Sequence, residues 1–271
     1  MRIAGTMMCF DRPHYLESVL KSFEEADEAH EIDWFMFQDG AVNEFSEVRY
    51  AEDGDLEDVA SLIRNTSLPV KEFFRQEYNV SPAQQRYLMY QVLQDYDLVY
   101  VFDDDMVIGQ HYFSLLRKMA LQYPNYVGLL FATGRIPVNK ESLRKLRTVR
   151  IARLWGHYMT RKNWLKFEDD HRIYYNHMKT RDYFIYMKRG GRRKDPLPER
   201  IPTGMDDCIV NHLCRRNGVE KLVPHISRAK YIGKYGNISY KLDKYWIKKG
   251  MANQREKITF PSDANLKRFN F

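Results

Sequence analysis

The chain has 271 residues, 44% of them hydrophobic, and a net charge of +7. This length is enough for one large α/β domain, or for a main domain with a small appendage, and the apolar content is ample for a sizeable core. No apolar stretch is long enough to span a bilayer, and Cys9, Cys208 and Cys214 form no CxxC pair, which excludes a disulfide framework and predicts a soluble, cytoplasmic protein.

The first half of the chain alternates strand and helix patterns. An apolar strand is predicted over 2–10, and a helix over 11–26 follows it with Asp11 as N-cap and Pro13 in the first turn. Strand patterns follow at 33–40, 70–74, 98–102 and 126–132, and helix patterns at 55–65, 81–95 and 110–123. Strands that alternate with helices predict an α/β fold with a mostly parallel sheet covered on both faces.

Three consecutive aspartates, Asp103, Asp104 and Asp105, follow the apolar strand at 98–102 directly. Ligands of open α/β sheets bind beyond the carboxyl ends of the strands, so this triplet is predicted to lie at a binding edge. Strand alternation places Asp103 and Asp105 on one side and Asp104 on the other. Clustered carboxylates are compatible when a divalent cation such as Mg²⁺ or Mn²⁺ lies beside them and shares the phosphates of a substrate.

A second interpretation of the triplet is purely structural. One aspartate caps the helix predicted near Gln110 while the other two are solvated. The triplet alone leaves both interpretations open.

Neighbouring stretches make the pattern more specific. The strand that ends in a DxD triplet resembles the metal site of GT-A glycosyltransferases, and further stretches resemble family 13, the N-acetylglucosaminyltransferase I-like enzymes. The matching stretches are CFDRPHYLESVLKSF, FQDG, VFDDDMVIGQHYFSLL, LWGHYMTRKNW and GMDDCIVNHLCRRNGVEKLVPHISRAKYIGKYGN. They occur in the family's order between about residue 3 and about residue 240. The resemblance implies a GT-A (Rossmann-like) fold and a UDP-sugar donor.

The same resemblance implies roles for the acidic triplet. Asp105 matches the carboxylate that binds the metal, which is Mn²⁺ or Mg²⁺, and Asp103 and Asp104 support it. Position 103 is Asp where the family has Glu.

Other residues are assigned to the nucleotide. Asp39 matches the aspartate that contacts the uracil, and Gln84 falls where the family has a nucleotide-contacting histidine. Arg12 follows the first strand and is placed to reach the nucleotide, or else pairs with a surface acid. Arg228 is a candidate clamp for the diphosphate, and Gly233 suggests a turn near the ligand.

Asp207 matches the catalytic base of the family, with Asp206 beside it, and the resemblance implies an inverting transfer. Both lie at a predicted helix start, where the helix dipole favours the ionised carboxylate that a base requires. An ordinary helix N-terminus with two stabilising acids is the alternative. Family 13 enzymes carry a membrane anchor and disulfides, and this chain shows neither pattern, so the donor chemistry is expected to be shared and the acceptor to differ.

The charge is divided unevenly along the chain. Residues 1–134 hold 10 Lys and Arg against 23 Asp and Glu, a net charge of −13, whereas residues 135–271 hold 33 against 13, a net charge of +20. We predict a nucleotide-sugar-binding half at 1–134 and an acceptor-binding and catalytic half, with a C-terminal tail, at 135–271 of the same domain.

The segment 135–200 has 19 basic against 7 acidic residues, interleaved with aromatic residues. This pattern favours a polyanionic acceptor, and hydroxymethylated DNA with its base flipped out is one candidate. An acidic or membrane-associated glycan is the competing acceptor. A basic nucleic-acid-binding module without catalysis is the alternative of another class.

Overall fold

The computed structural model describes residues 1–131, 146–149, 154–188 and 206–233, with only the backbone of 206–208. The strands are β1 (Ile3–Cys9), β2 (Asp33–Gln38), β3 (Val70–Arg75), β4 (Leu98–Asp103), β5 (Met106–Ile108), β6 (Val127–Leu129), β7 (Leu146–Val149), β8 (His157–Thr160), β9 (Lys221–Pro224) and β10 (Ala229–Tyr231). The helices are α1 (Pro13–Glu24), α2 (Asp53–Asn65), α3 (Ser81–Gln91), α4 (Tyr112–Gln122), α5 (Arg161–Trp164), α6 (Glu168–Met178), α7 (Tyr183–Lys188) and α9 (Asp206–Arg216), with short 3-10 turns at Ala29–Glu31 and Val92–Gln94.

Eight strands form the central sheet in the order β3-β2-β1-β4-β8-β6-β9-β7, and β10 pairs with β5 in a separate two-stranded sheet. The four strands β3, β2, β1 and β4 are mutually parallel, and β6 is parallel to β9. Strand β8 runs antiparallel between β4 and β6, and β7 runs antiparallel to β9. The predicted fold class, α/β with a mostly parallel sheet, is therefore confirmed.

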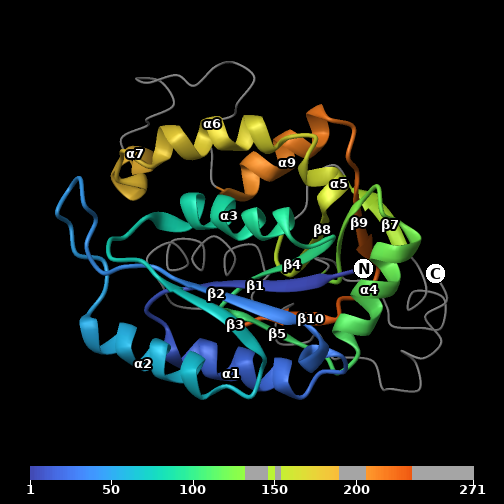
Figure 1. Cartoon of the computed structure of the whole chain (residues 1–271), viewed down its shortest axis with the longest axis horizontal. Helices are drawn as coiled ribbons and strands as arrows, with labels where there is room; N and C mark the ends of the chain where they lie inside the picture. Colours follow the sequence, from blue (N-terminus) through green and yellow to red (C-terminus); the bar gives the residue numbers. More distant parts are fainter. Residues whose placement is uncertain (132–145, 150–153, 189–205, 234–271) are drawn as a thin grey trace, which may run out of the picture.

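Helices cover both faces of the sheet (Figure 1). Helices α1 and α2 lie on one face, and α3 lies on the other with α6, α7 and α9 outside it. Between α1 and the sheet, the buried ring of Trp34 packs against Phe23, Phe102 and Phe113, with ring centroids 5.2, 6.1 and 5.6 Å away. Among the described helices, none combines the length and the apolar character that crossing a membrane requires.

The junction between β1 and α1 differs from the sequence prediction in one respect. Asp11 was expected to cap α1, but the helix begins at Pro13 and the N-cap position is held by Arg12, without a side-chain cap. The main-chain carbonyl of Arg12 accepts hydrogen bonds from the amides of Tyr15 and Leu16, both at 3.1 Å. The first turn of α1 therefore anchors the backbone of Arg12 and leaves its side chain for other partners.

Both halves of the sequence contribute strands to the central sheet, since β8, β9 and β7 follow residue 134 and join β4 and β6. The division of the domain at residue 134 into a nucleotide-sugar-binding half and an acceptor-binding half stays a prediction.

The contact between β1 and Trp34 yields a stability prediction. A Cβ at Gly5 would lie 2.5 Å from Trp34 Cε3, in a part of the core where the indole has no room to move. We expect Gly5→Ala to lower the free energy of unfolding by about 1–3 kcal/mol, as overpacking does elsewhere. Urea denaturation measures this change.

The matched control is Gly54→Ala, because a Cβ at that position in α2 meets nothing within 4 Å. Alanine in a helix is favoured over glycine, so this variant should unfold at the same or a slightly higher urea concentration. Equal stability of the Gly5→Ala variant and wild type contradicts the packing described here.

Candidate functional site

Strands β1, β2 and β4 end at one edge of the sheet. Cys9 of β1 is opposite Gln38 of β2, and Met8 is opposite Asp103 of β4. The amide of Asp39 donates to the carbonyl of Cys9 at 3.1 Å, so Asp39 continues this edge. The register thus places Asp39 on one side of β1 and the aspartate triplet on the other.

The triplet is divided between two arginines. Strand β4 ends at Asp103, whose Oδ1 lies 2.8 Å from Arg86 Nη2 on α3. Asp104 and Asp105 both pair with Arg12, with 2.9 Å between Arg12 Nη1 and Asp105 Oδ2. The predicted alternation, with Asp104 facing away from its neighbours, is wrong because residues 104 and 105 form a turn and alternation holds only within an extended strand.

The interpretation of the triplet as a helix cap is also wrong. Strand β5 separates the aspartates from α4, which begins at Tyr112. The N-cap residue of α4 is His111, which makes no side-chain cap and pairs with Asp27 instead.

Burial gives this cluster unusual electrostatics. Asp104 is 2% and Asp105 5% exposed, and this burial raises the pKa of both carboxyl groups, an effect that the Arg12 guanidinium opposes. One oxygen of each, Asp104 Oδ2 and Asp105 Oδ1, is buried without a hydrogen-bond partner among the described residues. Buried polar atoms are rarely left in this state, so these oxygens are suited to binding a ligand.

The cluster is not a complete metal cage. In the described ranges, no three His, Cys, Asp or Glu side chains are grouped so that they could hold an ion. Mg²⁺ and related ions are commonly held by one or two carboxylates and take their other ligands from water and substrate phosphates. The orphaned oxygens of Asp104 and Asp105 fit this second kind of site.

The segment after β10 closes the other side of the turn. The amide of Ile232 donates to the carbonyl of Asp105 at 2.9 Å, and the Tyr231 hydroxyl hydrogen-bonds the Asp105 carboxylate. The Tyr231 ring stacks on Trp155, with centroids 4.3 Å apart and planes at 10°. A Cβ at Gly233 would lie 2.5 Å from Asp105 Oδ2, which explains the glycine there.

Sequence reasoning missed the parts that Arg86 and Tyr231 play at this site. No local pattern could have revealed them, because each meets its aspartate only through the tertiary fold. Gly233 lies beside Asp105, and the predicted turn near a ligand at this glycine stays a prediction.

Asp39, which follows β2 at the carboxyl ends of the parallel strands, binds main-chain amides. Its carboxylate is buried and accepts hydrogen bonds from the amides of Gly40, Val80 and Ser81 at 3.0, 2.7 and 2.9 Å. Ser81 has a φ of +74°, a strained left-handed conformation that these bonds help to hold. Burial raises the pKa of Asp39 to about 7, against the effect of the amides. Its contact with a uracil stays a prediction.

The other residues that the sequence assigns to the donor or to catalysis lie on α3, just before β10, and at the start of α9. Gln84 is buried and donates to the carbonyl of Met178 on α6 at 3.5 Å. Arg228 is 1% exposed, and burial lowers its pKa to about 10. Asp206 and Asp207 begin α9, as the sequence predicts for a helix start, but their side chains lie outside the described residues.

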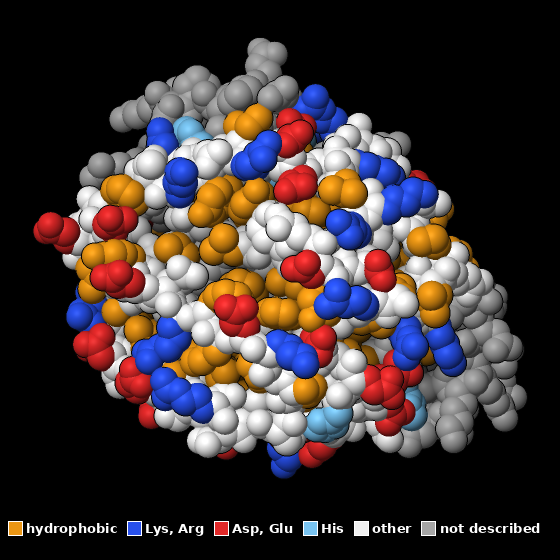
Figure 2. Space-filling view, viewed as in Figure 1, with side chains coloured by type: hydrophobic (Ala, Val, Ile, Leu, Met, Phe, Trp, Pro, Cys, Tyr) orange, Lys and Arg blue, Asp and Glu red, His pale blue; other side chains and the backbone are white. Residues whose placement is uncertain are grey.

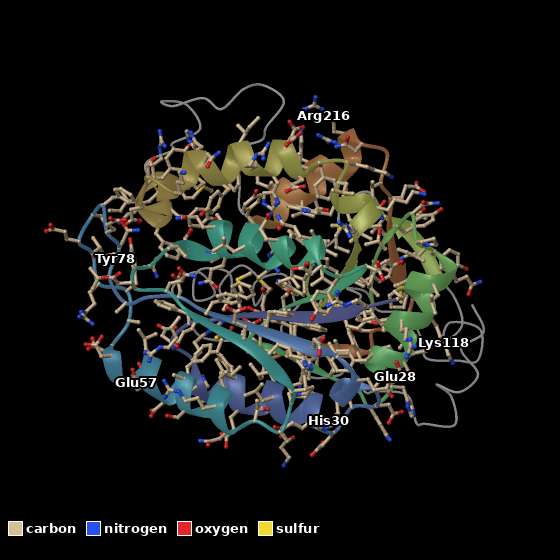
Figure 3. The ribbon with its side chains drawn as sticks, in the orientation of Figure 1. Glu28, His30, Glu57, Tyr78, Lys118 and Arg216 are labelled. Atoms are coloured by element: carbon tan, nitrogen blue, oxygen red, sulfur yellow. The ribbon has the colours of Figure 1, made fainter. Side chains whose placement is uncertain are left out.

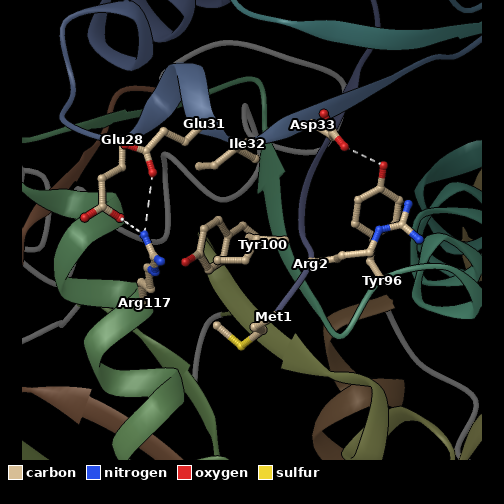
Figure 4. Close-up of a pocket in the computed structure, with 10 residues that line it drawn as sticks. Met1, Arg2, Glu28, Glu31, Ile32, Asp33, Tyr96, Tyr100 and Arg117 are labelled. Carbon is tan, nitrogen blue, oxygen red and sulfur yellow. Dashed lines mark hydrogen bonds and ion pairs between the residues drawn. The ribbon is translucent and has the colours of Figure 1, made fainter.

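A cavity of about 280 Å³ lies at the opposite, amino-terminal ends of the parallel strands (Figure 4). Its lining carboxylates are paired: Arg117 lies 3.4 Å from Glu28 and 3.6 Å from Glu31, and Tyr96 donates to Asp33 at 2.8 Å. Because it lies at the opposite ends of these strands, the cavity is separate from the aspartate triplet.

Comparisons with known proteins bear on the fold. No protein-family model matches the sequence, and no curated protein matches it. Among solved structures, TarS 1-349 of S. aureus in complex with UDP-GlcNAc matches with a TM-score of 0.53 and 14% identity, over 99% of this chain and 71% of that chain. TarS 1-349 without a named ligand matches with a TM-score of 0.47 and 14% identity, over 99% of this chain and 70% of that chain. Its complex with UDP matches with a TM-score of 0.43 and 13% identity, over 66% of this chain and 55% of that chain. The first likeness supports the GT-A-type fold, while the narrower resemblance to family 13 stays a prediction.

The raised pKa of Asp39 yields a prediction about stability and pH. Its pKa is about 7 in the folded protein against an ordinary 3.8, so between these values the folded state keeps a proton that the unfolded chain has lost. This contribution to stability is complete below the lower value and is lost as the pH rises through the higher one. Asp39→Asn cannot titrate there.

The free energy of unfolding of wild type minus that of Asp39→Asn should therefore fall between about pH 4 and about pH 7. Urea denaturation of both proteins across this range measures the difference. A difference that does not change with pH contradicts the burial described for Asp39.

Proposed function

We propose that the chain is a metal-dependent, inverting glycosyltransferase that moves a sugar from a UDP-sugar to an acceptor hydroxyl. The observation that carries the proposal is the pair of buried carboxylates, Asp104 and Asp105, with orphaned oxygens at the carboxyl edge of the sheet. The fold supports it, because TarS, with which the chain shares that fold, has been crystallised with UDP-GlcNAc.

The metal in this proposal is Mn²⁺ or Mg²⁺. Asp105 holds it, with Asp103 and Asp104 in support, because hard cations prefer carboxylate oxygens and share phosphate oxygens with a substrate. When bound, such an ion neutralises the negative charge that develops on a departing diphosphate.

The protein's own residues supply the rest of the chemistry. The acceptor oxygen forms a bond to the anomeric carbon while the bond from that carbon to the diphosphate breaks, and the hydroxyl proton passes to Asp207. Residues 206 and 207 begin α9, and a helix N-terminus favours the charged form of a carboxylate. Asp206 lies beside the base in sequence. Arg12 and Arg228 are assigned to the diphosphate, and Asp39 and Gln84 to the nucleotide.

A polyanion, and hydroxymethylated DNA in particular, is the acceptor that we propose. Figure 2 shows Lys and Arg side chains over the region of α5, α6 and α9, with acidic side chains between them. Figure 3 shows Arg216 projecting from the end of α9. The exposed basic residues of these helices and the turns after them are Arg161, Lys162, Lys166, Arg172, Lys179, Arg215 and Arg216. Much of the basic segment at 135–200 lies outside the described residues.

Two nearly isosteric variants test the donor chemistry. Asp105→Asn removes the charge that holds the metal, so Mn²⁺-dependent binding of UDP should be lost in calorimetry. Asp207→Asn should keep that binding, since the base does not touch the donor's phosphates, but transfer should fall by about 10²–10⁴-fold.

Each variant is the control for the other, and Asp206→Asn completes the set. Unchanged UDP affinity in Asp105→Asn overturns the metal assignment. Normal transfer by Asp207→Asn together with loss in Asp206→Asn exchanges the roles of the two carboxylates. DNA binding by the wild type without transfer or hydrolysis of any UDP-sugar favours a non-catalytic module.

The acceptor is tested through the salt dependence of binding. If the basic half binds duplex DNA, fluorescence anisotropy should give a log–log slope of about −0.9 per phosphate contacted. Replacing Arg189, Arg192 and Arg193 by glutamine, all outside the described residues, should flatten the slope and raise the acceptor KM but not the donor KM. Absence of DNA binding at low salt excludes nucleic acid as the acceptor and favours an acidic or membrane-associated glycan instead.

A further inference from the structure

Among the described residues, the ion pairs of the cluster at the carboxyl edge join three carboxylates to two guanidinium groups. Asp103 has Arg86 as a partner at 2.8 Å, whereas Asp104 and Asp105 share the single guanidinium of Arg12. Asp104 and Asp105 are almost fully buried, so water contributes little to stabilising their charge. With both ionised, one negative charge is left without a cation among the described residues.

Asp105 is held in place from the side opposite Arg12. Ile232 binds the main-chain carbonyl of Asp105, Tyr231 binds its carboxylate, and Gly233 lies against it. These contacts hold Asp105 in position when a second cation enters the cluster. If a charge moves on binding, it is that of Arg12.

Arg12 is placed to make such a movement. Its backbone is fixed by the first turn of α1, whereas its side chain is 20% exposed. The guanidinium carbon also lies 5.5 Å from the centre of the Tyr15 ring. A change of rotamer would exchange its partners, and guanidinium groups bind phosphate oxygens as well as carboxylates.

We infer that Arg12 is an exchangeable counter-ion: it neutralises Asp104 and Asp105 before the donor binds, and it moves to the donor's diphosphate when a divalent cation takes its place. This inference rests on the proposed function. It assigns Arg12 a second task besides contact with the donor, namely coupling the binding of the metal to the binding of the nucleotide.

The coupling follows from elementary electrostatics. Arginine cannot lose its proton at accessible pH, so a bare divalent cation meets a fixed positive charge a few ångströms away. A diphosphate removes this conflict, because it gives the guanidinium an alternative anionic partner. Metal and nucleotide must then strengthen each other's binding by the same factor, as linkage requires.

The experiment compares the affinity for Mn²⁺ alone with that at saturating UDP, in the full chain. Electron paramagnetic resonance of free Mn²⁺ gives both dissociation constants. In wild type, UDP should tighten Mn²⁺ binding by at least about tenfold, the equivalent of about 1.4 kcal/mol of coupling. In Arg12→Met, which keeps much of the length and loses the charge, Mn²⁺ alone should bind about tenfold more tightly than in wild type. In this variant, UDP should change the Mn²⁺ affinity little or not at all.

The matched control is Arg117→Met, which removes a guanidinium that pairs with Glu28 and Glu31 beside the opposite edge of the sheet. It should behave as wild type in both titrations. If Arg12→Met does not fold, Arg12→Lys replaces it: a lysine keeps the charge but not the planar fork, so Mn²⁺ alone should still bind weakly while the coupling to UDP decreases.

The outcomes separate the inference from the function on which it rests. If wild type binds no UDP in the presence of Mn²⁺, the proposed function fails and the inference with it. If wild type binds UDP with Mn²⁺ but Arg12→Met shows unchanged or weaker affinity for Mn²⁺ alone, the counter-ion inference is wrong and the donor assignment stands. Equal Mn²⁺ affinity of wild type with and without UDP also overturns the inference.

Discussion

The ion cluster of Arg12 with Asp104 and Asp105 is the interaction on which the site depends. Removing such charges from water is expensive, and the attraction between them often repays no more than this penalty. The cluster also leaves two carboxylate oxygens without a partner among the described residues, so it is a poor way to stabilise a fold. Incompletely satisfied buried charge at the carboxyl ends of the strands is what a cationic ligand or a metal–phosphate complex can complete, and this agrees with the proposed donor site.

Several strands and one helix hold the residues of this cluster in position. Parallel pairing of β1 with β2 and β4 brings the ends of three strands to one edge, although they are far apart in the sequence. Helix α3 contributes Arg86 from one face, and the antiparallel pair of β5 and β10 brings Tyr231 to the Asp105 side chain. The bonds of Asp39 to Val80 and Ser81 fix the start of α3, so the helix that carries Arg86 is itself tied to the end of β2.

Much of this was predictable because it follows local rules. The apolar runs and the helical spacing from Tyr15 to Phe23 predict β1, α1 and β4, and the end of the apolar run places the aspartates at the carboxyl ends of the strands. The partners of the aspartates were not predictable. Arg12 could equally have paired with a surface acid, and Arg86 carried no signal at all, because ion pairs between distant segments depend on the three-dimensional packing. The alternation rule failed at Asp104 for a related reason: it describes a strand, and the chain had already begun to turn.

The distribution of charge along the chain bears on the role of Arg12 in binding an anionic donor. Residues 1–134 have a net charge of −13, yet the proposed donor is a diphosphate and therefore an anion. An anion that approaches an acidic surface is repelled unless positive charge awaits it at the point of contact. Arg12 supplies such charge before the donor arrives, but it is held by two carboxylates and is not free for the phosphates. Under the proposed function, Asp104 and Asp105 would hold a divalent cation that arrives with the nucleotide, and Arg12 would then be free to bind the phosphates. The proposal thus predicts that a diphosphate binds at the acidic half only together with its metal.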